Sequence, residues 1–171
     1  MDVDRELVSD FNTQSLAQGW GLHCSPCDAF DNPLLLTLRK LWIKTAAGRP
    51  APSKNDFSIR VLAPHLGHVS FIERVNGAPR RYRLRFFGSI LATITGDHTG
   101  KYLDDVLPPS GVQGWTTLYD LFIDTSTPLR VRSNSILAGL DHLSAEVYLA
   151  PLAADGELPR GVLGACLFGP R

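Results

Sequence analysis

The sequence predicts an α+β fold: a five-stranded antiparallel sheet with helices on one face and a helical extension at the N-terminus. Three observations predict it. Two strand-like segments come before a helical middle part, three more follow it, and helical periodicity is clear near the N-terminus. The predicted strands are residues 68–74, 81–87, 129–137, 143–152 and 162–168.

A helix is predicted near residues 33–46, within an N-terminal extension of residues 1–48. Asn32 can cap this helix and Pro33 suits its first position. Residues 48–53 hold two prolines and a glycine, which favour an extended link, so residues 49–171 are predicted to form the main domain. The apolar stripe of the helix is Leu34, Leu38, Leu41 and Trp42.

The clearest predicted strand is 81–87, where aromatic and aliphatic residues alternate with arginines. Asn76-Gly77 signals a hairpin with the strand before it. The last strand, 162–168, is apolar on both faces, which is typical of a central strand. In the helical middle part, residues 111–123 carry a stripe at helical spacing, made of Trp115, Leu118, Tyr119 and Phe122.

Composition and charge argue against several functions. The chain has 171 residues, of which 44% are hydrophobic and 20% charged, an ordinary globular balance. Seventeen basic residues match 17 acidic ones, which does not favour nucleic acid as a partner. No run approaches the roughly 18 apolar residues of a membrane helix, and residues 1–6 are acidic where a secretory signal is basic. We therefore expect a cytoplasmic protein without a membrane partner.

Two motifs carry a resemblance to a known family. Residues 82–88 read Tyr-Arg-Leu-Arg-Phe-Phe-Gly, and residues 96–103 read Gly-Asp-His-Thr-Gly-Lys-Tyr-Leu. With them, the stretch 41–106 resembles a family of short, stand-alone bacterial PAS-domain proteins, whereas residues 1–32 lie outside the resemblance. Further landmarks are Trp42, residues 48–52, Asp56 and residues 62–66.

The resemblance implies a non-catalytic sensory or regulatory module. Such a module binds a small ligand or a protein partner and signals through non-covalent interaction. PAS domains hold their ligand, where they have one, in an apolar cavity between sheet and helices. We expect a homodimer and an unidentified signalling protein or small molecule as partner, because the sequence shows no output domain.

Eight residues are predicted to face a common interior and to line such a cavity. Strand alternation and helical spacing turn them the same way, and tyrosine and tryptophan would supply polar groups that orient a ligand. The alternative is that the same side chains fill a core. The candidates are Tyr82, Leu84, Phe86, Ile94, Tyr102, Trp115, Tyr119 and Phe122.

A second hypothesis is a thiol-redox or metal sensor at His23, Cys24 and Cys27. Two cysteines at this spacing can bind zinc or form a disulfide, and the histidine can add a nitrogen ligand. A structural zinc site needs four ligands, however, and the third cysteine, Cys166, lies in an apolar strand. Inert thiols are the alternative.

The sequence argues against bound haem or flavin and against an enzyme. Residues 111–123 hold no histidine for a haem iron, and the central region holds no cysteine for flavin photochemistry. The chain also has no nucleophile motif, phosphate-binding loop or dinucleotide fingerprint. The cofactor, if any, stays unknown at this stage.

Five arginines are predicted to lie on the sheet face away from the cavity. One interpretation is a docking surface for an acidic partner or an anionic nucleotide, since guanidinium groups suit phosphate and carboxylate. The other is a solvated face that prevents aggregation. These residues are Arg81, Arg83, Arg85, Arg130 and Arg132.

Overall fold

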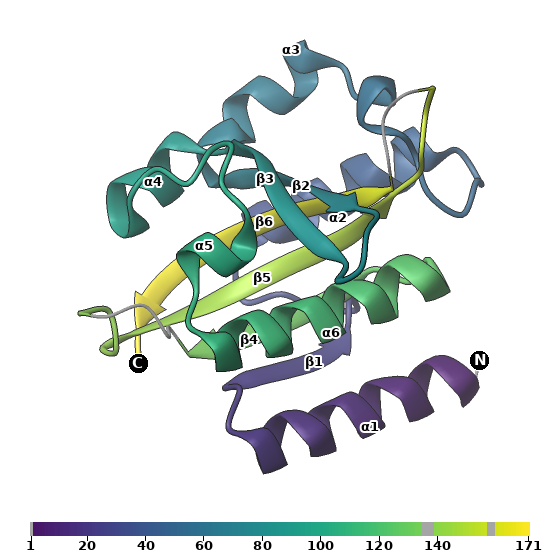
Figure 1. The fold of residues 1–171 in the computed structure, drawn as a ribbon. Helices are drawn as coiled ribbons and strands as arrows, with labels where there is room; N and C mark the ends of the chain where they lie inside the picture. Colours follow the sequence, from purple (N-terminus) through teal and green to yellow (C-terminus); the bar gives the residue numbers. More distant parts are fainter. Residues whose placement is uncertain (1, 135–138, 157–159) are drawn as a thin grey trace.

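The computed structural model describes residues 2–134, 139–156 and 160–171, with side chains from residue 5 on, and shows a mixed α+β domain (Figure 1). Its strands form one sheet in the order β1-β4-β5-β6-β2-β3, and all paired neighbours are antiparallel. The strands are β1 (Leu22–Pro26), β2 (Val69–Val75), β3 (Arg81–Phe87), β4 (Leu129–Asn134), β5 (Leu143–Leu152) and β6 (Gly161–Pro170). Of the strand predicted at 129–137, residues 135–137 lie outside the described residues.

The predicted α+β class is confirmed, but the sheet has six strands rather than five. The additional strand is β1, which pairs with β4 through Leu22 to Pro26. Its alternation of buried Leu22 and Cys24 with exposed His23 is the strand signal that the sequence analysis missed.

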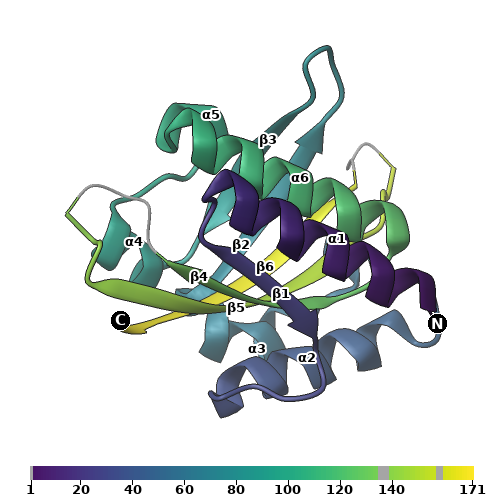
Figure 2. The ribbon, with the colours of Figure 1, turned by 90° about the horizontal axis from the view of Figure 1, so that it is seen from below.

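The helices lie on both sides of the sheet, not on one. In Figure 2, α1, α5 and α6 lie above the sheet, and α2 and α3 lie below it. Two separate apolar cores result, because β5 and β6 send buried side chains to both faces. The helical elements are α1 (Asp2–Gln18), α2 (Pro33–Ala46), η1 (Lys54–Asp56), α3 (Ile59–Leu62), η2 (Ala63–His68), α4 (Ser89–Thr95), α5 (Leu103–Val106) and α6 (Pro109–Thr125).

Helix α2 spans the residues predicted for it, for local reasons. Asn32 accepts a hydrogen bond from the backbone N–H of Leu34 at 2.9 Å, and Pro33 occupies the first turn. The helix ends at Ala46, after which Ala47 takes a left-handed conformation with φ of 49°. The division of the chain after residue 48 stays a prediction.

Both free edges of the sheet are covered by other parts of the chain. At β1, the side-chain amide of Asn12 donates to the carbonyl of Cys24 at 2.9 Å and accepts from its N–H at 2.7 Å. Ser15 of the same helix bonds the backbone of Leu22. At β3, residues 100–101 make backbone hydrogen bonds to Leu84. These contacts satisfy edge groups that would otherwise pair with another chain.

No helix in the described part of the chain combines the length and the apolar character needed to cross a bilayer.

Candidate functional site

The aromatic residues predicted on 111–123 pack between α6 and the sheet. The rings of Tyr82 and Tyr119 have centroids 5.0 Å apart, and Tyr119 also contacts Trp115 at 5.6 Å and Phe122 at 6.0 Å. Leu84 belongs to the same apolar core. Five of the eight predicted cavity residues are therefore brought together on this face.

Phe86 was predicted to share this core, but the structure places it in the other one. A register shift between β2 and β3 pairs Phe71 with Phe86 but Ile72 with Leu84, so Arg85 is an additional residue on β3. Such a bulge reverses the alternation after it. Phe86 therefore packs in the second core against Phe71, while Phe87 joins the core of Tyr82.

Ile94 and Tyr102 lie outside both groups of buried core residues. Ile94 is half-buried on α4. Tyr102 is half-buried beside the edge strand β3, where the guanidinium of Arg81 stacks 3.7 Å from its ring centroid. None of the eight residues lines the groove beside β1 described below or the small hollow between Leu7 and Leu129. The core under α6 is thus packed with side chains in this conformation.

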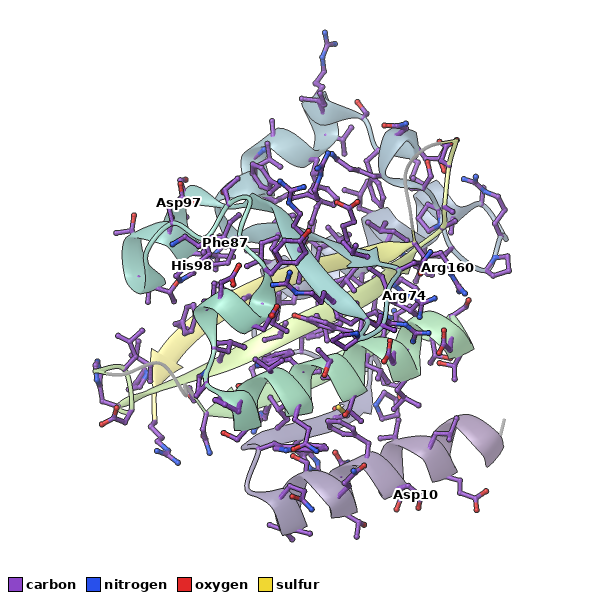
Figure 3. All side chains as sticks on the ribbon, in the orientation of Figure 1. Asp10, Arg74, Phe87, Asp97, His98 and Arg160 are labelled. Atoms are coloured by element: carbon purple, nitrogen blue, oxygen red, sulfur yellow. The ribbon has the colours of Figure 1, made fainter. Side chains whose placement is uncertain are left out.

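A charged cluster ties α6 to the hairpin of β2 and β3. The hydroxyl of Tyr82 donates to Asp120 at 2.5 Å, and Arg80 donates to the same carboxylate at 2.8 Å. Arg74 bonds Asp124 at 2.8 Å, and burial with the Asp120 hydrogen bond raises the pKa of Tyr82 well above its ordinary value. Figure 3 shows Arg74 and Arg160 beside the last turns of α6, where Arg160 donates to the carbonyl of Ile123 at 2.5 Å.

His98, within the motif of residues 96–103, lies between α4 and β3. The rings of His98 and Phe87 are 5.4 Å apart, edge to face, and Figure 3 shows the two side chains together. The ring Nε2 of His98 lies 3.0 Å from the carbonyl oxygen of Thr95. Its Nδ1 is buried without a partner among the described residues.

The cysteine hypothesis is not supported by the geometry. Cys24 lies in the core under α6, whereas Cys27 lies in the core under α2 on the opposite face of the sheet. Burial raises the pKa of each thiol to about 12, so neither is activated. His23 is exposed, and the described residues contain no group of three side chains suited to hold a metal.

The five arginines do not form one surface. Arg81, Arg83 and Arg85 lie on β3 at one edge of the sheet, and three strands separate them from β4. Arg130 and Arg132 of β4 pair instead with Asp31, and Arg130 also bonds Glu146 at 2.6 Å. Alternation predicts the face of the sheet on which a side chain lies but not the order of the strands, so the arginines form two groups rather than one continuous surface.

An open groove of about 1740 Å³ follows the edge of β1, between α1 and α2. Leu16 on α1 and Ile43 on α2 line it and are 86% and 47% exposed. Arg5 and Arg39 line it from the same two helices. The groove leaves no signal in the sequence, because its walls come together only in the tertiary structure.

A family model described as a PAS domain matches residues 31–167 of the chain. The comparison with curated proteins and the comparison with solved structures gave no match. The match covers most of both apolar cores and the Tyr82–Asp120 cluster, but not α1 or β1.

Proposed function

The chain belongs to the PAS-domain family, and from that premise we propose that it is a sensory or regulatory module that works without catalysis. It would bind a small ligand or a protein partner and pass the signal through non-covalent contacts. The observation that carries this proposal is the family match over residues 31–167. A homodimer and a cytoplasmic location are further parts of the proposal.

The core between α6 and the sheet is the proposed place for a small ligand. Tyr82, Leu84, Trp115, Tyr119 and Phe122 converge there. Because these side chains fill the space, a ligand would have to select a conformation in which α6 or its neighbours have moved. Such a ligand shifts the equilibrium only by its difference in affinity for the two conformations.

Helix α6 is well placed to transmit such a movement. Through Asp120 and Asp124 it holds the hairpin of β2 and β3, and it also packs against α1. A displacement of α6 would therefore act on the hairpin and on the N-terminal helix together. These are the elements through which a partner would sense the change.

The test is native mass spectrometry of the purified protein, followed by a thermal-shift screen of small molecules. A ligand present at about 100 times its Kd should add about 2.7 kcal/mol of stability. Hydrogen exchange should then show added protection in α6 and β3 but not in α2. Protection confined to α2, or turnover of the ligand, would contradict this function.

A further inference from the structure

We propose that the groove between α1 and α2 is a docking site for an acidic amphipathic helix of a partner protein. The inference uses one part of the proposed regulatory function, namely that the protein signals through a partner. It concerns a different part of the molecule, since α1 and β1 precede the residues that match the PAS family.

The dimensions of the groove favour a polypeptide over a small molecule. Pockets for small molecules measure about 300–1,000 Å³ and enclose most of their ligand. This groove has about 1740 Å³ and is open to solvent along the edge of β1. A segment of a partner protein fills a space of that kind.

The edge of β1 offers few free backbone hydrogen-bonding groups to a partner strand. Strand addition needs free backbone N–H and C=O groups along the edge. Here Ser15 bonds the backbone of Leu22, and Asn12 bonds that of Cys24. The strand then ends at Pro26, which has no N–H to offer. A helix that binds through its side chains does not need these backbone groups.

The charge and the exposed apolar side chains of the groove define the partner. Arg5 on α1 and Arg39 on α2 line the groove, and neither has an ion pair among the described residues. Leu16 and Ile43 offer apolar contacts on the opposing walls. A partner helix with an apolar stripe flanked by carboxylates is complementary to both the cations and the apolar side chains of the groove.

The acidic residues of the groove do not cancel this preference. Asp31 and Glu146 are already paired with the arginines of β4, which leaves Asp28 as the one lining carboxylate without a described ion pair. Tyr148 also lines the groove, and its buried hydroxyl has no partner within the described residues.

The experiment selects binders to the full chain from a displayed library of amphipathic helices about 18 residues long, a length that supports helix formation. Positions beside the apolar stripe vary among Asp, Glu, Lys and Arg. We expect acidic sequences to be enriched and to bind more weakly as salt rises. The double variant Arg39→Glu/Ile43→Ser should weaken the selected peptide about tenfold or more.

The matched control is Arg60→Glu/Val61→Ser on α3, since Val61 is 49% exposed and lies outside the groove. It should leave binding unchanged. A second pair, Leu16→Ser with Ile59→Ser as its control, serves if the first variant unfolds. Enrichment of basic or uncharged sequences, no enrichment, or equal loss in variant and control would overturn the proposal. Ligand binding under α6 would be unaffected, so the two proposals can fail separately.

Discussion

The hydroxyl of Tyr82 on β3 lies 2.5 Å from a carboxylate oxygen of Asp120 on α6, and this hydrogen bond joins the edge strand to the helix that covers the main core. Tyr82 is buried, whereas Asp120 also meets Arg80 at the surface. The buried hydroxyl of Tyr82 thus bonds a carboxylate that is partly exposed and also pairs with Arg80. The helix and the hairpin are linked by a bond to a charged group, which is stronger than a neutral one.

Replacing Tyr82 by Phe should therefore destabilise the protein by about 1.5–3 kcal/mol, the usual range for a hydrogen bond to a charged group. Tyr148→Phe is the matched control, because Tyr148 is equally buried and its hydroxyl has no partner among the described residues. That change should be neutral or stabilising. Urea unfolding measures both, and equal losses would mean that the Asp120 bond contributes nothing.

The side chain of Asn12 substitutes for a neighbouring strand at the edge of β1, which leads to a second prediction. Asn12→Ala leaves both backbone groups of Cys24 without a partner and should cost about 1–3 kcal/mol. Hydrogen exchange should rise at the amide of Cys24 and in α1. Thr13→Ala is the control, since that hydroxyl is exposed and bonds only Ser9 of its own helix. An unchanged amide at Cys24 would contradict this account of the edge.

The parts of the fold that the sequence predicts are those determined locally. Asn32 and Pro33 fix the start of α2, and the spacing of Trp115, Tyr119 and Phe122 fixes the buried face of α6. The apolar pattern of residues 162–168 also identified a central strand, since β6 lies between β5 and β2.

Features that depend on strand pairing were missed. The bulge at Arg85 depends on the register between β2 and β3, and it sends Phe86 to the opposite core. The five-residue strand β1 is defined by its pairing with β4, far along the chain. Strand order placed Arg83 and Arg130 near opposite edges. The register of the bulge and the order of the strands leave no local pattern in the sequence, whereas β1 leaves only a short alternation over residues 22–24.

Stability should fall as the solution becomes alkaline, because burial raises the pKa of the Cys24, Cys27 and Cys166 thiols from 9.0 to about 12. Above pH 9 the unfolded chain releases these protons and the folded chain does not. Each thiol should then lower the free energy of unfolding by up to about 1.4 kcal/mol per pH unit until the pH reaches about 12. Below pH 9 the contribution is constant.

Urea unfolding at about pH 8 and about pH 10.5 measures this slope. The variant with all three cysteines replaced by alanine should show a shallower fall, since only the buried tyrosines remain to contribute. Each slope, the change in the free energy of unfolding with pH, is measured within one protein. The pH-independent loss of stability from the smaller alanine side chains therefore cancels. An identical slope in both proteins would mean that the thiols are exposed to solvent in the folded state.

Two arginines on one strand provide the last prediction. The Arg130 side chain is 15% exposed and bonds Glu146, whose carboxylate also accepts the N–H groups of Asp31 and Asn32 before α2. The Arg132 side chain is 59% exposed and pairs with Asp31 alone. Arg130→Gln should therefore cost about 3 kcal/mol, because it leaves a carboxylate mostly buried and without its cation. Arg132→Gln should cost less than about 1 kcal/mol, as exposed ion pairs do.

Chemical denaturation of the two variants compares the same substitution two residues apart on β4. Adding Glu146→Gln to Arg130→Gln should recover part of the loss, because the uncompensated charge is removed. Hydrogen exchange should rise at the start of α2 in Arg130→Gln and stay unchanged in Arg132→Gln. Similar losses in both single variants would mean that Glu146 holds α2 through its backbone hydrogen bonds, with no need for the arginine.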